Sequence, residues 1–308
     1  MENNLINNNL FEINSKVLYS ENSLFNSINL IKKDYKKILI IIDSFLYKKT
    51  KYIHKFLAKL KKNKVNFFIF LYDSNFEPGY DYVDEKSLML KKKLKNFDAI
   101  FACGGGSTLD FSKALAVTLK SKKKSRYFRG FSETANSYPI IAAPTTVSTG
   151  SEAAYYAPLI DEKTKIKFGI NIKSNTPKIS ILDPKLIVES DKKFVMLCAL
   201  SSLIRSIESY YSKKSNYISK IISKISFDLI QKNIKKYDKN HKDLKAINRI
   251  QLGAYFSVLA LSNSGAGLAG SLSYHFSTKH NVPQSLGNAL FGLNTIKINI
   301  ANGFYKDR

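Results

Sequence analysis

The stretch Ala99-Ile100-Phe101-Ala102-Cys103-Gly104-Gly105-Gly106-Ser107-Thr108-Leu109-Asp110-Phe111-Ser112-Lys113 decides the fold of this chain. A short apolar run breaks into three glycines, and a helical pattern begins at once, with Ser107 expected at the N-cap. Only glycine lets the backbone turn this sharply and come close to a ligand. The free N–H groups at the start of the helix then make a site for a phosphate. The alternative is a tight strand-to-helix turn that binds nothing.

Strands alternate with helices on the N-terminal side of this turn. The apolar patterns predict strands at 16–19, 37–43 and 65–71, with a helix after each of them that ends near 32, 63 and 96. Another strand begins near Tyr138, and residues 166–182 are typical of a β-ribbon. This alternation predicts βαβ units and a parallel sheet.

The periodicity of the apolar residues changes near Asp191. The remaining segments carry apolar residues at helical spacing and predict helices at 201–211, 217–235, 244–262, 266–277 and 285–304. We therefore expect an α/β domain at residues 1–190 and an all-helical domain at residues 191–308.

Two further stretches offer ligand-binding groups. Asp43 ends a strand, where its carboxylate could bond a ribose or could cap a helix. The loop Pro144-Thr145-Thr146-Val147-Ser148-Thr149-Gly150-Ser151-Glu152 is dense in hydroxyl groups. Such hydroxyls suit hydrogen bonds to sugar and phosphate, and they also suit an ordinary capped loop.

Composition narrows the class of protein. The 308 residues contain no apolar run of the roughly 20 residues that cross a bilayer, and the N-terminus lacks the pattern of a secretory signal. Two cysteines, Cys103 and Cys198, form no disulfide framework, so we expect a cytoplasmic protein without a membrane partner. The net charge of +25 comes from lysines spread along the whole chain, which favours solvated helix faces over a nucleic-acid surface.

Four motifs in this order resemble the iron-containing alcohol dehydrogenase family, which has the dehydroquinate synthase-like fold. They are Gly104-Gly105-Gly106-Ser107 with Asp110 and Lys113, Pro144-Thr145-Thr146 with Thr149-Gly150-Ser151-Glu152, Lys167-Phe168-Gly169-Ile170, and Ile181-Leu182-Asp183-Pro184. The resemblance implies a Rossmann-like nucleotide-binding domain, a helical domain, and NAD or NADP as cofactor. The cofactor-binding residues that it implies are Asp43, Gly104, Gly105, Gly106, Ser107, Asp110, Thr145, Thr146, Thr149 and Lys167.

Shorter matches are similar to the 3-deoxy-octulosonate 8-oxidase branch of that family. They lie at Glu77-Pro78, Tyr82-Val83-Asp84, Phe168-Gly169-Ile170-Asn171, Ser273-Tyr274 and Gly287-Asn288. This likeness implies oxidation of the terminal alcohol of an eight-carbon lipopolysaccharide sugar. Because members of the branch are described as oxidases, oxygen is an alternative to the nicotinamide as electron acceptor.

The chain departs from the family at its metal site. The family binds iron or zinc through one Asp and three His, and its pattern places Ser201, Arg205, Gly270 and Gln284 at those four positions. A guanidinium repels a cation, so we expect no bound metal. A register shift of one residue would instead place His275 on a family histidine, near His280, but two imidazoles facing Arg205 make a poor site.

The resemblance also implies that the chain stops early, at Arg308, before the closing helices of the family. The helical domain is then expected to be truncated, with part of its core either covered by a partner subunit, as in a homodimer, or left less stable.

Three functions remain open. The first is an oxidoreductase acting on a primary alcohol or sugar acid, in which Arg205 stabilises an alkoxide and Lys167 or Tyr274 moves the proton. The second is a non-catalytic descendant that binds dinucleotide or a sugar acid, with Arg205 holding a carboxylate. The third, ranked last, is a basic nucleic-acid-binding module.

Overall fold

The computed structural model describes residues 10–94, 96–131, 135–147, 149–265, 267–280 and 282–305. The chain divides into two compact units. The sheet unit comprises residues 14–145 and 151–187, and the helical unit comprises residues 1–13, 146–150 and 188–308. The division into two independent domains, with the boundary between residues 190 and 191, remains a prediction.

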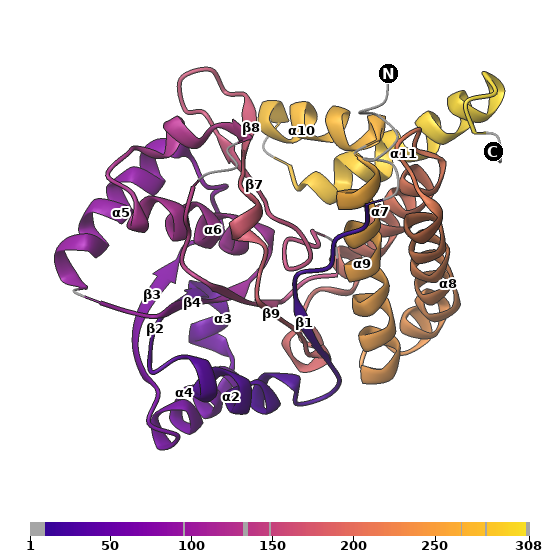
Figure 1. Ribbon diagram of the computed structural model, residues 1–308. Coiled ribbons are helices and arrows are strands. Elements are labelled where there is room, and N and C mark those ends of the chain that lie inside the picture. Colours follow the sequence, from indigo (N-terminus) through magenta and orange to yellow (C-terminus); the bar gives the residue numbers. More distant parts are fainter. Residues whose placement is uncertain are drawn as a thin grey trace. The chain divides into compact units, whose positions relative to one another are not determined.

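In the described residues the sheet unit is built on six parallel strands in the order β1-β9-β6-β4-β2-β3. Helices lie on both sides of this sheet (Figure 1). The strands are β1 (Lys16–Tyr19), β2 (Lys37–Asp43), β3 (Asn66–Tyr72), β4 (Ala99–Gly104), β6 (Ile140–Pro144) and β9 (Ile179–Leu182). The inner strands β2 and β4 are buried almost throughout, as expected where helices cover both faces of a parallel sheet.

Alternating residues of β2 serve two separate cores. Ile38, Ile40 and Ile42 pack with apolar residues of α2 and α4. Leu39 and Ile41 pack on the other face with residues of α5 and α6. The helices of this unit are α2 (Ser23–Asp34), α3 (Ser44–Lys49), α4 (Lys51–Lys62), α5 (Tyr80–Lys93) and α6 (Gly106–Lys120), with short 3-10 helices at Ser125–Phe128, Lys173–Asn175 and Pro184–Leu186. The result is a layer of strands between two layers of helices, which confirms the predicted α/β class.

A second, smaller sheet has the order β5-β8-β7. Its strands are β5 (Gly130–Phe131), β7 (Tyr156–Ile160) and β8 (Lys167–Asn171), and β7 pairs with β8 in antiparallel register. The prediction of a ribbon over residues 166–182 is therefore wrong in extent. Only β8 belongs to the ribbon, and β9 joins the large sheet because it pairs in parallel with β1 and β6.

The described residues of the helical unit form five helices, as predicted. They are α7 (Lys192–Tyr211), α8 (Tyr217–Lys239), α9 (Leu244–Ser264), α10 (Leu268–His280) and α11 (Gln284–Ala301). The first helix begins nine residues before the predicted start at Ser201, because the Asp191 carboxylate accepts the N–H of Phe194 and caps it. Within the described residues, every helix is too short or too polar to cross a membrane.

Candidate functional site

The predicted glycine turn lies where β4 ends and α6 begins. The N-cap residue is Gly105, in extended conformation, so the prediction of an N-cap at Ser107 is wrong. The first intrahelical hydrogen bond runs from the Leu109 N–H to the Gly105 carbonyl at 3.1 Å. The N–H groups of Gly106, Ser107 and Thr108 precede it, and an α-helix offers such groups no acceptor of its own. N–H groups of this kind at the start of a helix are able to bind an anion.

Close packing explains the first glycine of the turn. A Cβ atom on Gly104 would lie 2.4 Å from Oγ1 of Thr108 and 2.6 Å from its Cβ atom. The Gly104 carbonyl accepts the N–H of Thr145 at 3.0 Å, which joins the turn to the end of β6. The Thr108 hydroxyl is buried and has no hydrogen-bond partner among the described residues. A cradle that excludes a Cβ atom, beside an unsatisfied hydroxyl, fits a bound diphosphate.

Asp110 and Lys113 lie one turn apart on α6 and meet at Ser151. The Ser151 hydroxyl donates to Asp110 Oδ1 at 2.7 Å and accepts from Lys113 Nζ at 2.7 Å. Lys113 also donates to the Tyr156 carbonyl at 2.9 Å. The network ties α6 to the start of β7, so Asp110 is engaged within the unit. Its contact with a cofactor remains a prediction.

Burial sets the charges of this network. Burial raises the pKa of Asp110 to about 6, although Lys113 and the Ser151 hydroxyl act to lower it. Burial lowers the pKa of Lys113 to about 8, against the attraction of Asp110 and Glu152. The attraction between Asp110 and Lys113 therefore does not fully compensate for the desolvation of these two groups.

We expect Asp110→Asn to remove a pH-dependent part of the stability. The raised pKa means that the folded state keeps a proton on Asp110 between pH 3.8 and about 6, where the unfolded state has lost it. The protonated Asp110 side chain therefore contributes about 3 kcal/mol to the free energy of unfolding below pH 3.8, and this contribution is lost as the pH rises through about 6. Urea unfolding from pH 3.5 to 7 should show the difference in unfolding free energy, wild type minus variant, falling by that amount. A rising difference would mean that the Lys113 charge outweighs burial.

Lys167 forms an ion pair with a residue that the sequence analysis gave no role. Its Nζ atom lies 2.8 Å from Oε1 of Glu77, and the Lys167 side chain is 6% exposed. Lys167 begins β8, and its charge also helps to lower the pKa of Asp110. Oε2 of Glu77 is buried without a hydrogen-bond partner among the described residues. Only the Glu77-Pro78 match hinted at this residue, because a pairing across 90 positions leaves no local signal.

The Asp43 carboxylate caps a helix, which is the second of the two roles that the sequence allowed. Oδ1 accepts the N–H of Leu46 at 2.9 Å and caps α3. Its predicted contact with a ribose remains untested.

The threonine loop is divided between the two units. Thr145 belongs to the sheet unit, whereas Thr146 and Thr149 belong to the helical unit. The hydroxyls of Thr146 and Thr149 are buried and have no hydrogen-bond partner in the described part of the chain. Gly150 follows with a φ of 56°, and a Cβ atom there would lie 2.2 Å from the side chain of Val258. Glycine is thus required at this position for both conformation and space. The predicted Ser148 of this loop lies outside the described residues.

The helical unit holds the remaining predicted residues. Ser201 and Arg205 lie one turn apart on α7, and both are buried. Asn288 Nδ2 of α11 donates to the Ser201 hydroxyl at 2.9 Å, and Arg205 Nη1 approaches the Ser257 hydroxyl of α9 at 3.5 Å. Tyr274 is half-buried on α10.

Gly270 and Gln284 supply little that could hold an ion. Gly270 lies on α10, and a Cβ atom there would have no neighbour within 4 Å. Gln284 begins α11 and is half-buried.

Glu208 is a second charged residue on this face of α7 that the sequence analysis missed. Its Oε1 atom accepts the N–H of Ala269 at 2.8 Å, at the start of α10. Burial raises its pKa, while this N–H and the charge of Arg205 act to lower it. A Cβ atom on Gly267 would lie 2.1 Å from the Glu208 carboxyl carbon. Contacts of Glu208, Asn288 and Ser257 connect α7 to three other helices.

These residues do not fit an iron or zinc ion. A serine engaged by Asn288, an arginine, a glycine and an amide offer neither a carboxylate nor an imidazole. In the described ranges, no group of three or more His, Cys, Asp and Glu side chains could hold a metal ion.

Comparison with protein families gives two matches that together span most of the chain. Residues 14–184 match the family model "Iron-containing alcohol dehydrogenase", and residues 196–306 match its C-terminal model, "Fe-containing alcohol dehydrogenase family, C-terminal". The chain belongs to the iron-containing alcohol dehydrogenase family. The family resemblance and the fold expected from the sequence are thereby confirmed.

The individual relatives compared with this chain share a low sequence identity with it. The chain is 25% identical over 256 residues to the NAD-dependent methanol dehydrogenase of Bacillus methanolicus, covering 83% of this chain and 66% of that enzyme. The solved alcohol dehydrogenase of Oenococcus oeni has a TM-score of 0.84 at 23% identity, over 91% of this chain and 74% of that one. Sulfoacetaldehyde reductase of Bifidobacterium kashiwanohense, solved in complex with NAD+, has a TM-score of 0.83 at 19% identity, over 94% and 76%. The chain thus spans about two thirds of the methanol dehydrogenase, and the likeness to both solved structures is one of fold.

Proposed function

We propose that this protein oxidises a primary alcohol, with NAD or NADP as acceptor and without the divalent metal of its family. Sugar acids are the proposed substrates, and the C8 hydroxyl of a 3-deoxy-octulosonate sugar is the specific candidate. The observation that carries the proposal is the start of α6 after the glycine turn at Gly104, with N–H groups that have no acceptor within the helix, in a chain of this family. When bound, the nicotinamide ring accepts the hydride that leaves the alcohol carbon.

The chain's own residues would then bind and orient this cofactor. The N–H groups of Gly106, Ser107 and Thr108 would bind the diphosphate, in a turn whose close packing against Thr108 requires Gly104. The proposed contacts to the ribose and nicotinamide sides are Asp43, Asp110, Thr145, Thr146, Thr149 and Lys167.

Proton movement falls to Lys167 or Tyr274 in this proposal. The alcohol must lose its hydroxyl proton, and the ε-amino group of Lys167 or the phenol of Tyr274 would carry it away. The Arg205 guanidinium would stabilise the negative oxygen that remains, because a fixed cation in a buried site needs no reorganisation.

A second candidate is a non-catalytic protein that binds dinucleotide or a sugar acid. The substitutions at Ser201, Arg205, Gly270 and Gln284 favour it, since a buried guanidinium suits a carboxylate as well as an alkoxide.

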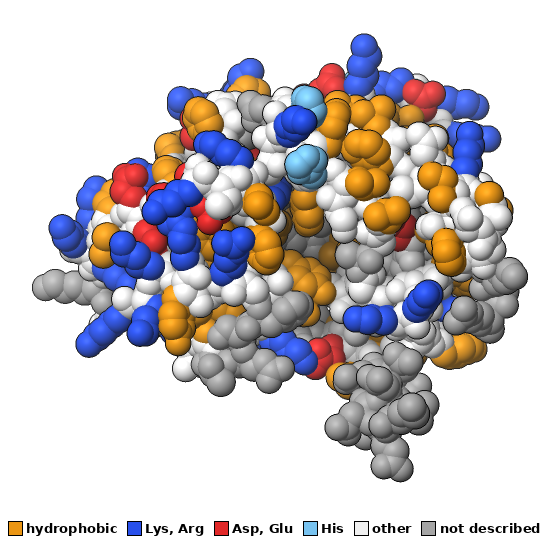
Figure 2. Space-filling model, turned by 90° about the horizontal axis from the view of Figure 1, so that it is seen from above, with side chains coloured by type: hydrophobic (Ala, Val, Ile, Leu, Met, Phe, Trp, Pro, Cys, Tyr) orange, Lys and Arg blue, Asp and Glu red, His pale blue; other side chains and the backbone are white. Residues whose placement is uncertain are grey.

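Under either function we propose a cytoplasmic protein with no nucleic-acid or membrane partner. On the face that Figure 2 shows, lysine and arginine are interspersed with apolar, acidic and other side chains, which supports the absence of a nucleic-acid-binding surface there. We also propose a homodimer, supported by the exposed apolar residues Leu290, Leu293 and Ile300 of α11.

Cofactor titration and turnover test the two candidates separately. We expect NADH fluorescence to change on binding at micromolar concentrations, and absorbance at 340 nm to rise with sugar acids and primary alcohols. Binding without turnover would favour the second candidate, and peroxide release in place of NADH would make oxygen the acceptor. Absence of dinucleotide binding would contradict both the cofactor assignment and the proposed dehydrogenase.

We expect the purified protein to be insensitive to metal removal. Because the four positions offer no ligand set, EDTA should leave both the unfolding midpoint and the NADH affinity unchanged. Elemental analysis should find far less than one iron or zinc per chain. Stoichiometric metal, or a midpoint that falls in EDTA, would overturn the metal-free assignment.

A further inference from the structure

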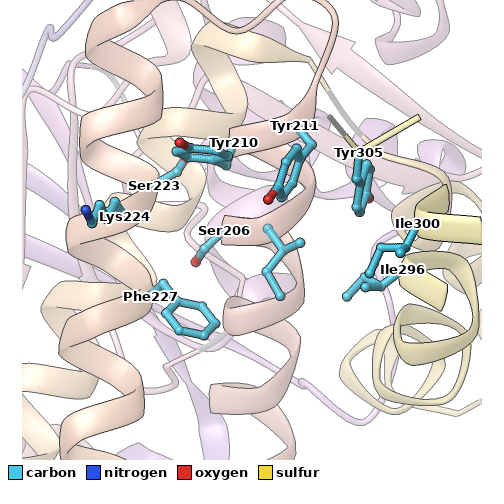
Figure 3. A pocket seen from close by; sticks show the side chains of 10 residues that line it. Ser206, Tyr210, Tyr211, Ser223, Lys224, Phe227, Ile296, Ile300 and Tyr305 are labelled. Carbon is cyan, nitrogen blue, oxygen red and sulfur yellow. The ribbon is translucent and has the colours of Figure 1, made fainter. Parts of the chain in front are cut away.

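The hollow of the helical unit offers a ligand little besides apolar contact. It lies among α7, α8 and α11, and the side chains around it are mostly apolar or aromatic (Figure 3). Among the described residues that line it, only Lys224 carries a charge. The sheet unit offers more, because Lys167 Nζ and Glu77 Oε1 lie 2.8 Å apart there and the Lys167 side chain is 6% exposed.

The backbone after Glu77 is tied to the ribbon of β7 and β8 that carries Lys167. The Ile160 N–H donates to the Pro78 carbonyl at 2.9 Å. Ile160 is also the cross-strand partner of Lys167 in the pairing of β7 with β8. Because a proline follows it, the backbone of Glu77 is restricted and favours an extended conformation. Glu77 is thus held in a segment that lies next to the cross-strand partner of Lys167.

Two further hydrogen bonds fix the ends of this segment. The Tyr72 hydroxyl of β3 donates to the Phe76 carbonyl at 2.7 Å, directly before Glu77. The Tyr80 hydroxyl of α5 donates to the Phe168 carbonyl of β8 at 3.0 Å. An ion pair between two freely moving side chains contributes little, because both lose conformational freedom. Here the backbone that carries the carboxylate is fixed in advance, which lowers this cost and favours one position for the ammonium.

Lys167 and Glu77 also affect the charge of α6. Burial raises the pKa of Asp110 to about 6, while the charge of Lys167 acts to lower this pKa and the charge of Glu77 acts to raise it. Asp110 belongs to α6, the helix whose first N–H groups we assign to the diphosphate. The ion pair therefore acts on the same helix that would hold the cofactor.

We propose that Glu77 is a positioning residue for Lys167, and that its carboxylate fixes the ammonium where it binds the nicotinamide half of the dinucleotide. This inference rests on the proposed function, in which Lys167 is a contact on that side. A donor that is already in place loses little freedom when the ligand binds, so its charge-assisted hydrogen bond adds to the affinity. ADP contains the diphosphate but lacks the nicotinamide half, so its binding should not depend on Glu77.

Paired titrations of the full chain with NADH and ADP test the proposal. Lys167→Met should weaken NADH binding about 10-fold, and Glu77→Gln about 3- to 10-fold, whereas both should leave ADP affinity within about 2-fold. In the Lys167→Met background, Glu77→Gln should change NADH affinity by less than about 2-fold, because the side chain that it positions is gone. The unfolding midpoint without ligand checks that each variant is folded.

Glu85→Gln is the matched control. It removes the same charge from an exposed ion pair of α5, in which Glu85 lies 2.7 Å from Lys86. An exposed pair of this kind contributes little, so NADH affinity should stay within about 2-fold of the wild type.

A labelling measurement tests the positioning without a dinucleotide. Acetic anhydride reacts with neutral amines, and a nearby carboxylate favours the unreactive ammonium. Glu77→Gln should therefore raise the rate of Lys167 acetylation, measured by mass spectrometry, at least about 3-fold. The rate at Lys224, in the other unit, should stay the same.

The outcomes separate this proposal from the proposed function. Glu77→Gln that weakens ADP as much as NADH would make Glu77 a structural residue and overturn the proposal, as would wild-type NADH affinity in that variant. A wild-type chain that binds neither nucleotide would contradict the proposed function, and with it the role of Glu77 in dinucleotide binding. The acetylation rates would then still show whether Glu77 holds Lys167.

Discussion

Gly104→Ala is expected to lower the free energy of unfolding by about 1 to 3 kcal/mol and to weaken NADH binding more than 10-fold. The added methyl group would lie 2.4 Å from Thr108 Oγ1 and 2.6 Å from its Cβ, so Thr108 and the first turn of α6 must move. That turn carries the N–H groups that we assign to the diphosphate. Urea unfolding and NADH fluorescence titration measure the two effects.

Gly270→Ala is the matched control for this substitution. A Cβ atom at Gly270 meets no other atom within 4 Å, and alanine is the better helix former by about 1 kcal/mol. We expect this variant to be neutral or slightly stabilising, with unchanged NADH affinity. Thr108→Gly in the Gly104→Ala background removes the clashing side chain and should restore part of the affinity. If Gly104→Ala binds NADH as the wild type does, the turn does not hold the dinucleotide.

The elements that local pattern determines could be predicted from the sequence. The run Lys37 to Asp43 is apolar on both faces because helices cover both sides of β2, and that composition identifies a parallel strand. The break from Cys103 into three glycines likewise marked the end of β4 and the start of α6. The error at Ser107 arose because a serine near a helix start is a strong N-cap signal, whereas the packing of Gly104 against Thr108 accompanies an N-cap two residues earlier, at Gly105.

Pairing between distant elements could not be predicted in the same way. The strand at Ile179 to Leu182 is as apolar as a ribbon strand, and only its parallel pairing with β1 and β6 places it in the large sheet. The site shows the same limit. Lys167 was identified from its motif, but its partner Glu77 lies 90 positions away, and two α-helices, one 3-10 helix and four strands lie between them in the described chain.

The second large effect is expected at Glu208, which sequence reasoning also missed. Glu208→Ala should lower the free energy of unfolding by about 1 to 3 kcal/mol, because it removes a carboxylate that the charge of Arg205 stabilises and leaves the Ala269 N–H without its acceptor. Glu208→Gln keeps an acceptor and should cost less. Urea unfolding at constant pH measures both.

A double-mutant cycle with Arg205→Met separates charge from packing at this position. If Glu208 compensates for the buried guanidinium, removing both charges should cost less than the sum of the single losses, with a coupling of about 1 to 3 kcal/mol. Glu208 in addition links α7 directly to α10, because it accepts the Ala269 N–H. A coupling near zero would mean that Glu208 does not compensate for the charge of Arg205. A folded Arg205→Met chain that still binds NADH but forms none from alcohols would, in contrast, connect this cation to the reaction itself.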